Sequence, residues 1–369
     1  MSKKAYIGIY DVAKKIRKSY VGIDGVARRI KKVYIGIGGV ARPCWSGGEL
    51  VYYGTLAEQI EYRYSLAATS LGNYALFGGG LGSSSSSSTV DAFDKSLVRT
   101  APAGLSKSRD SLSAASVGDY AIFAGGLSGS TASSNVDAYN TSLTRSVYSL
   151  AYARFGLSAT NIGDYAIFAG GTDSNNSADI YMAVDVFDKS LTRTSPDSLR
   201  TRRKDAGATN IGNYALFGGG NSGSYESSVE AYDKSLTHTI PTTLSVGRQD
   251  LAATSVGNYA LFGGGYSDGG RKATVDAYDT SLTRTSPTEL SAGRDRLAAA
   301  SIGDYALFAG GNSPYLSAVV DAYDSSLTRT TPTALSNPKN DLAGASVGNY
   351  TLFGGGYGTG SLVNVYTVV

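Results

Sequence analysis

The sequence has little of what disulfide-stabilised, metal-binding and membrane-spanning proteins require. Its 369 residues include one cysteine and one histidine. One cysteine excludes an internal disulfide framework, and the two residues together argue against a Cys/His metal site within the chain. No window approaches the roughly 18 apolar residues that span a bilayer, and the N-terminus lacks an apolar run of signal-peptide length. We therefore expect no metal, no cofactor and no membrane span, and synthesis in the cytoplasm without a signal peptide.

Charge and proline are also scarce. Charged residues make up 17% of the chain and proline occurs eight times, whereas glycine occurs 47 times and tyrosine 27 times. Glycine is therefore nearly twice as frequent as its usual share of roughly 7%. The glycines have no period of three, which excludes a collagen triple helix. This composition indicates many short strands joined by tight turns.

A repeat of about 46 residues accounts for most of the glycine and tyrosine. The segment GNYALFGGG at 72–80 recurs seven times, with its tyrosine at positions 74, 120, 165, 214, 259, 305 and 350. A run similar to LAATS precedes each copy, and a run similar to VDAYDTSLTRT follows the first six copies. Self-similarity at a fixed period is the sequence signature of a repeat architecture.

Each repeat predicts four short strands, which we name a to d in chain order. Strand a is the LAATS run, strand b is YALFGGG, strand c is VDAYD and strand d is LTRTSP. These are strand-forming residues with turn signals between them, and the Gly-Asn or Gly-Asp between strands a and b suits a tight hairpin. Four-stranded units of this length have the size of a propeller blade. The sequence therefore predicts an all-β, seven-bladed propeller with strand a next to the axis.

The last repeat is incomplete, because the chain ends with strand c at 363–369. Residues 49–55 form a strand-like run just before the first strand a. We expect the seventh blade to combine the C-terminal strands a, b and c with this N-terminal strand d. Such closure removes open sheet edges, which otherwise invite aggregation.

An acid on strand c lies eight positions before a basic residue on strand d in six repeats. The two are expected to face each other across the hairpin as a structural pair, each exposed pair adding about 0.2–1 kcal/mol. The pairs are Asp91 with Arg99, Asp137 with Arg145, Asp185 with Arg193, Glu230 with His238, Asp276 with Arg284, and Asp321 with Arg329. In the seventh repeat both partners change together, to Asn364 and Tyr52, which supports the split blade.

These repeats resemble the kelch-type propeller family. The resemblance lies in the Gly-Gly doublet that ends strand b and in an aromatic residue on strand c, at Phe93, Tyr139, Phe187, Tyr232, Tyr278 and Tyr323. It covers about residues 49–369 and departs from the usual pattern by lacking a repeated tryptophan, since Trp45 is the one tryptophan present. The resemblance implies the fold and no particular function, because kelch propellers serve many functions.

Residues 1–45 form a different unit with a period of 14, in which AYIGIYDVAKKIRK is followed by SYVGIDGVARRIKK and VYIGIGGVARPCW. Asp24-Gly25 and Gly38-Gly39 are hairpin signals, so we expect a small β-meander that associates with another chain or with the propeller. This unit carries 11 basic residues against two aspartates, a net charge of +9, whereas the rest of the chain has a net charge of −6.

The 14-residue repeats resemble the short tandem repeats near the termini of tail-associated proteins of Firmicutes phages and prophages. That resemblance implies a virion or tail component and no catalytic activity. The basic residues at the repeat ends are then candidates for anchoring the protein to other virion or tail proteins: Lys14, Lys15, Arg17, Lys18, Arg28, Arg29, Lys31 and Lys32. Nucleic acid is a weaker candidate partner, because the tyrosines recur once per strand and suit packing better than base stacking.

Loop variation indicates where the propeller binds a partner. The distance from the tyrosine of strand b to the start of strand c varies from 13 to 19 residues, while the other spacings within a repeat are constant. A rigid scaffold with divergent loops on one face is a common way to build a binding surface. Tyrosines in or beside these loops are candidate sugar-stacking residues: Tyr181, Tyr225, Tyr266, Tyr315 and Tyr357.

A basic residue also lies three positions before each strand a. These residues are Arg63, Arg109, Arg154, Arg203, Arg248, Arg294 and Lys339. Because strand a is innermost, they are expected to ring the axial mouth on the b–c loop face. One interpretation is an anion-binding rim for acidic glycans or phosphate-bearing polymers. The other is a structural role, in which each residue caps a loop or pairs with a carboxylate.

An enzyme is not expected, because no nucleophile–base pair can be assembled around the single histidine, His238. We predict a non-enzymatic virion or tail-type structural protein, located in the virion, whose b–c loop face binds a host-surface glycan or protein. Self-association into a homo-oligomer is left open. One alternative is a cellular protein-interaction scaffold with a nucleic-acid-contacting basic segment. Another is a glycosidase that uses carboxylates of the axial channel.

Overall fold

The computed structural model describes residues 48–369 apart from 57–59, 175, 177–178 and 359–360. Before residue 48 it describes the backbone of six short strands. The described elements are all β-strands. No described segment forms a helix with the length and apolarity needed to cross a membrane.

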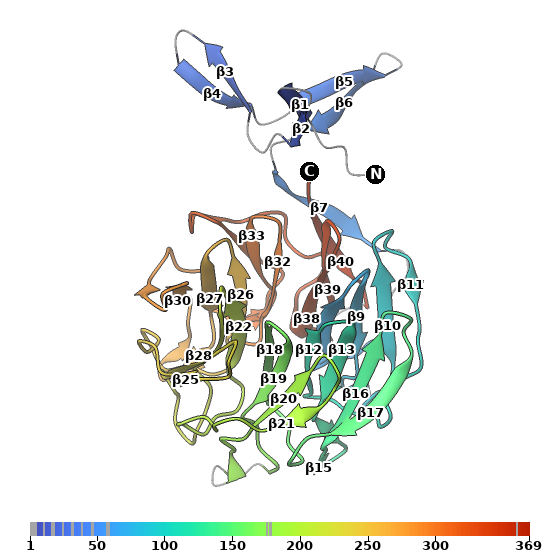
Figure 1. Cartoon of the computed structure of the whole chain (residues 1–369), viewed down its shortest axis with the longest axis vertical. Helices are drawn as coiled ribbons and strands as arrows, with labels where there is room; N and C mark the ends of the chain where they lie inside the picture. Colours follow the sequence, from blue (N-terminus) through green and yellow to red (C-terminus); the bar gives the residue numbers. More distant parts are fainter. Residues whose placement is uncertain are drawn as a thin grey trace.

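Seven four-stranded antiparallel sheets form the blades of a propeller (Figure 1), as the repeat predicts. Blades 1 to 4 consist of β8 (Ala67–Leu71), β9 (Tyr74–Gly78), β10 (Val90–Asp94) and β11 (Arg99–Thr100); β12 (Ser113–Val117), β13 (Tyr120–Ala124), β16 (Asn135–Asn140) and β17 (Arg145–Ser149); β18 (Ser158–Ile162), β19 (Tyr165–Ala169), β20 (Val184–Asp188) and β21 (Arg193–Thr194); and β22 (Gly207–Ile211), β23 (Tyr214–Gly218), β24 (Val229–Asp233) and β25 (His238–Thr239). Blades 5 to 7 consist of β26 (Ala252–Val256), β27 (Tyr259–Gly263), β30 (Val275–Asp279) and β31 (Arg284–Thr285); β32 (Ala298–Ile302), β33 (Tyr305–Ala309), β36 (Val320–Asp324) and β37 (Arg329–Thr330); and β38 (Lys339–Val347), β39 (Tyr350–Gly358), β40 (Asn364–Val368) and β7 (Leu50–Thr55).

The seventh blade is closed by the N-terminal strand, as predicted. β7 pairs with β40 in the order β38-β39-β40-β7, and Figure 1 shows β7 beside the C-terminus. The Tyr52 hydroxyl donates a hydrogen bond to Asn364 Oδ1 at 3.0 Å, which joins residues 312 positions apart. The propeller is therefore held shut by strands from both ends of the chain.

Three b–c loops fold back as small hairpins. These are β14 (Leu127–Ser128) with β15 (Thr131–Ala132), β28 (Tyr266–Ser267) with β29 (Gly270–Arg271), and β34 (Asn312–Ser313) with β35 (Tyr315–Leu316). They belong to blades 2, 5 and 6, so the loops that diverge in sequence also differ in structure.

The hydrophobic core lies between neighbouring blades, in clusters that each draw on two adjacent sheets. Between blades 1 and 2, for example, Leu76 and Ala92 pack with Phe123 and Tyr139. The strand-c aromatic that suggested kelch repeats is buried here, and the Tyr139 hydroxyl donates to the Ala103 carbonyl at 2.7 Å. Burial raises the pKa of this phenol, so it remains a neutral donor.

The segment before the propeller contains three hairpins: β1 (Tyr6–Ile9) with β2 (Val12–Lys15), β3 (Ser19–Ile23) with β4 (Val26–Ile30), and β5 (Val33–Ile37) with β6 (Val40–Trp45). Ile23 pairs with Val26 and Ile37 with Val40, whereas the predicted turn residues between them, Asp24-Gly25 and Gly38-Gly39, lie outside the described residues. Each pair is a separate two-stranded sheet, whereas the sequence suggested one continuous meander. A 14-residue repeat specifies each hairpin and leaves the pairing between hairpins unspecified.

Candidate functional site

The residues that precede each strand a share one face of the propeller with the b–c loops. Tyr64 pairs with Leu81, the first residue after the glycine doublet, and the same bridge recurs at Gln249 with Tyr266. The start of strand a therefore neighbours the divergent loops, as the sequence predicts. We call the opening at the centre of this face the axial mouth.

One residue from each blade forms a closed ring around the axial mouth, which we call the mouth ring. Each backbone N–H donates to the carbonyl of the preceding member at 2.9–3.1 Å, and Ser65 N–H closes the circle on the Asp341 carbonyl. Every member has a positive φ, between 49° and 62°. The members are Ser65, Ser111, Gly156, Asp205, Asp250, Arg296 and Asp341. The backbone is uniform around the ring, so its side chains alone give the mouth its chemistry.

A cavity of about 240 Å³ lies at the axial mouth. Its floor includes five leucines from the first position of strand a, at Leu66, Leu112, Leu157, Leu297 and Leu342. Its rim is polar and includes Asp205, Arg296 and Asp341 of the mouth ring. An apolar floor under a few convergent polar groups is the usual composition of a ligand site.

The pKa values of the mouth-ring carboxyl groups are raised above the usual range of aspartate. Burial, with a further contribution from Asp250, raises the pKa of Asp205 to about 7. Burial also raises the pKa of Asp341 to about 6 and the pKa of Asp250. Arg296 lies between two of these groups, with its Nε 3.9 Å from Asp250 and its Nη1 3.8 Å from Asp341. Perturbed titratable groups in a cleft mark candidate functional sites.

The raised pKa of Asp205 predicts a pH-dependent stability. Because the folded protein holds this proton more tightly than the unfolded chain, stability rises as the pH falls from about 8 towards 4. We expect Asp205→Asn to raise the free energy of unfolding by about 1–2 kcal/mol at pH 8, below the full linkage value because the mouth is open to solvent. The gain should vanish near pH 4. Denaturant titrations at both pH values measure it.

A matched control is Asp119→Asn. Asp119 is exposed in an a–b turn, at a position where other blades carry asparagine. This variant should leave stability unchanged at both pH values. Equal effects of Asp119→Asn and Asp205→Asn at pH 8 would contradict a specific penalty at the mouth.

Tyrosine rings flank the mouth in two sectors. Tyr357 is 51% exposed and packs edge-on against Tyr64 with ring centroids 5.5 Å apart. The ring centroids of Tyr225 and Tyr266, from the loops of blades 4 and 5, lie 5.9 Å apart. The pKa of Tyr64 is raised by burial, with contributions from Tyr62, Asp110 and Asp341. Burial likewise raises the pKa of Tyr225, with a contribution from Asp250, so each pair of tyrosines lies near a mouth-ring carboxylate.

The other two predicted tyrosines stand apart from these sectors. Tyr181 stacks on Tyr152 with centroids 5.4 Å apart, and its hydroxyl donates to Asp173 at 2.7 Å. Tyr315, on β35, is 83% exposed. Sequence reasoning missed Tyr64 and the mouth-ring carboxylates, because the ring position varies among serine, glycine, aspartate and arginine from blade to blade.

The predicted basic rim is wrong. The guanidinium groups of Arg63, Arg109, Arg154, Arg203, Arg248 and Arg294 are buried, and each pairs with the strand-c acid of its own blade. Their position three residues before strand a places the backbone near the mouth, while the side chains run into the blade. An anion at the mouth cannot reach them, so the structural interpretation is supported.

In blades 1 to 6 each strand-c acid is shared by two basic residues. Asp276, for example, accepts from Arg248 at 2.9 Å and from Arg284 at 2.7 Å. The expected strand-d partner is therefore present in all six pairs, at 2.5–3.7 Å, but the acid is fully buried rather than exposed. In blade 7 the corresponding residues are Lys339, Asn364 and Tyr52. Burial lowers the pKa of Lys339 to about 8, and its ammonium donates a hydrogen bond to the Leu362 carbonyl.

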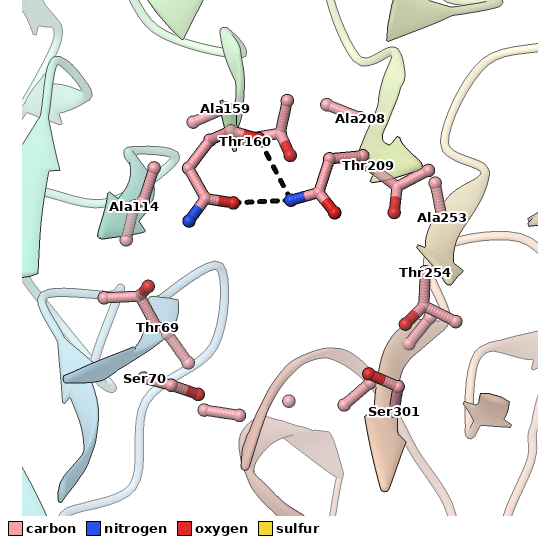
Figure 2. A pocket seen from close by; sticks show the side chains of 18 of the residues that line it. Thr69, Ser70, Ala114, Ala159, Thr160, Ala208, Thr209, Ala253, Thr254 and Ser301 are labelled. Carbon is pink, nitrogen blue, oxygen red and sulfur yellow. Dashed lines mark hydrogen bonds between the residues drawn. The ribbon is translucent and has the colours of Figure 1, made fainter. Parts of the chain in front are cut away.

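A second cavity, of about 340 Å³, occupies the opposite end of the axis. Figure 2 shows small side chains of the inner strands, such as Ala114 and Ser301, around an open centre. Asn210 Nδ2 donates to Asn161 Oδ1 at 2.5 Å across neighbouring blades. The lining is hydroxyl, amide and alanine, without a charged group. The two ends of the axis therefore differ in charge.

The remaining predicted residues lie in the N-terminal segment. Lys14 and Lys15 fall on β2, and Arg28 and Arg29 on β4. Arg17, Lys18, Lys31 and Lys32 lie outside the described residues. Among the described residues, no group of three or more His, Cys, Asp or Glu side chains is arranged to hold a metal ion.

Comparison with known proteins identifies the fold. No protein-family model matches the chain, and no curated protein sequence matches it. Many solved structures are similar, among them the structure of a protein named YjhT, at a TM-score of 0.60 and 16% identity over 75% of this chain and 99% of that chain. At this identity the similarity shows the seven-bladed propeller and nothing of its ligand.

Proposed function

We propose that this chain is a non-enzymatic, kelch-like structural protein of a virion or phage tail, which binds a host-surface glycan through the axial mouth. The observation that carries the binding role is the placement of tyrosines, one exposed and the others partly buried, beside carboxylates on the face with divergent loops. Tyrosine rings suit the apolar faces of sugars, and carboxylates accept hydrogen bonds from sugar hydroxyls. The basic N-terminal hairpins would anchor the protein to other particle proteins.

The charge of the mouth selects the class of glycan. The seven basic residues before strand a are buried, whereas Asp205, Asp250 and Asp341 face the axis with one arginine. Like charges across an interface cost binding energy. A neutral or amino-bearing glycan therefore fits the mouth better than the acidic polymer that a basic rim would attract.

Glycan-array binding of the full chain tests the proposal. We expect binding to neutral or amino-bearing polysaccharides, with an affinity loss of about tenfold for Tyr357→Ala and for Tyr266→Ala, equivalent to ~1.4 kcal/mol. Tyr53→Ala is the matched control, because Tyr53 is a similarly exposed tyrosine on the outer strand β7. Unchanged glycan affinity in both Tyr357→Ala and Tyr266→Ala would refute the proposed site. Cleavage of a bound polysaccharide that stops in Asp205→Asn would instead indicate the glycosidase alternative.

Deletion of residues 1–45 tests the anchor. The truncated chain retains β7, so we expect a folded propeller with unchanged glycan binding that no longer joins particles. Incorporation is measured by immunoblotting purified particles assembled with either form. Assembly of the truncated chain would refute the anchor, and salt-sensitive retention of DNA by residues 1–45 would favour the cellular scaffold.

A further inference from the structure

The outer edge of blade 2 differs from the outer edges of the other blades. In blades 1, 3, 4, 5 and 6 the outermost strand has two residues, whereas β17 has five and pairs with β16 along its whole length. β7, in blade 7, is also long, but a register shift in its pairing with β40 interrupts it and Gly54 has a φ of 127°. Within the described part of the chain, β17 is the one long and regular outer edge.

Proline explains the short edges elsewhere. It stands three residues after the strand-d basic residue in five blades, at Pro102, Pro196, Pro241, Pro287 and Pro332. Proline cannot donate a backbone hydrogen bond, so it ends an edge strand and blocks pairing with another chain. In blade 2 the equivalent residue is Tyr148. This blade therefore lacks the protection that the repeat supplies elsewhere.

The side chains of β17 also favour pairing. Val147 is 49% exposed and Tyr148 is 37% exposed, and β-branched and aromatic residues are the best formers of cross-strand pairs. The one charged residue, Arg145, lies 3.7 Å from Asp137, which it shares with Arg109. No described strand pairs with the outer side of β17. The edge thus has unpaired backbone groups and a single charged side chain, at one end of the strand.

We propose that β17 is a docking edge for a second copy of this chain, joined antiparallel about a two-fold axis through Val147. In this register Val147 faces Val147 of the other copy, Tyr148 faces Ser146, and Arg145 faces Ser149. No like charges face each other and Val147 packs on its own copy, so the sequence RSVYS is complementary to itself. An isologous contact of this kind closes as a dimer, and two blades become one eight-stranded sheet.

Sedimentation velocity of the full chain tests the dimer. A short strand pairing buries less than the ~1,200–2,000 Å² of a standard interface, so the titration should run from about 5 to 500 μM. We expect concentration-dependent dimerisation that is lost in Tyr148→Pro and retained in Tyr152→Ala, which removes a more exposed tyrosine outside β17. Tyr148→Pro should lower the thermal midpoint only slightly, because it removes pairing with β16 at the end of β17 and leaves an outer strand like those of the five blades that carry proline there. A wild-type chain that stays monomeric, or a Tyr148→Pro variant that still dimerises, overturns the proposal.

A cross-link tests the register. Facing residues of antiparallel strands have Cα atoms about 4.5–5.5 Å apart, which matches disulfide geometry. In a Cys44→Ser background we expect Val147→Cys to form an intermolecular disulfide on mild oxidation. Ser149→Cys should not, because its two copies would lie about 13 Å apart along the strands. Equal cross-linking of both variants, or of neither, overturns the two-fold pairing. An extended segment of a different protein at this edge would give no homodimeric cross-link.

Discussion

Asp276→Ala should lower the free energy of unfolding by about 3–5 kcal/mol, because it leaves a buried charge without its partner. The Asp276 carboxylate is fully buried, forms an ion pair with Arg248, and accepts hydrogen bonds from Arg284 and from the Ser245 backbone and hydroxyl. Burial lowers the pKa of Arg248, and Asp276 is the charge that opposes this shift. Chemical denaturation of the variant and the wild type measures the loss.

Two controls separate the buried charge from the loss of any ion pair. Asp164→Ala removes a carboxylate that is 66% exposed and lies 2.5 Å from Lys189, and it should cost about 0–1 kcal/mol. The triple change Arg248→Lys, Asp276→Asn and Arg284→Tyr copies the set that blade 7 carries, and should recover most of the stability that Asp276→Ala loses. If Asp276→Ala and Asp164→Ala cost the same, the buried triads do not stabilise the blades.

Gly264→Ala should destabilise the protein by several kcal/mol, because the added methyl group would collide with atoms of the next blade. Gly264 has a φ of 70°, and a Cβ atom there would lie 2.5 Å from the Arg294 carbonyl oxygen and 2.9 Å from Leu297. The next residue, Gly265, donates its N–H to that same Arg294 carbonyl at 2.7 Å. Relief of the clash would shift the backbone that joins blades 5 and 6, so we expect about 3–5 kcal/mol, at the high end for single substitutions.

Gly270→Ala separates the clash from backbone strain. Gly270 also has a positive φ, 103°, but a Cβ atom there would meet nothing within 4 Å. Its cost should be the strain alone, about 1–3 kcal/mol. Thermal unfolding of both variants decides the matter: a Gly270→Ala loss as large as that of Gly264→Ala would mean that the doublet is conserved between repeats for its φ and not for its contact with the next blade.

The blades and their closure can be predicted from the sequence because the same strand pattern recurs from blade to blade. Tyr74 and its equivalents, Gly-Asn turns and a constant a–b spacing each predict the same hairpin, and the joint change to Asn364 and Tyr52 correctly pairs the two chain ends. The arginines were placed by position along the chain alone. Spacing locates a backbone relative to strand a, but it does not tell whether a long side chain points to the axis or into the sheet.

The mouth ring was not predicted, since its side chains follow no repeat. Ser65, Gly156, Asp205 and Arg296 occupy one structural position with four different side chains. A signal is nevertheless present: serine, glycine and aspartate dominate the position before the first residue of strand a, and glycine and aspartate are among the residues that tolerate a positive φ. The positive φ is therefore constant at this position while the side chain varies, as expected where one backbone scaffold supports different contacts.

Because β7 pairs with β40, which lies about 300 residues later in the chain, β7 must wait for its partner during synthesis. Translation at ~5–20 residues per second means that β7 leaves the ribosome about 15–60 s before the strand that it pairs with. During that interval six blades can form in order, while β7 waits with both edges unpaired. The chain would therefore benefit from a chaperone or from neighbouring copies until synthesis ends. Circular permutation that moves β7 behind β40 would remove the delay.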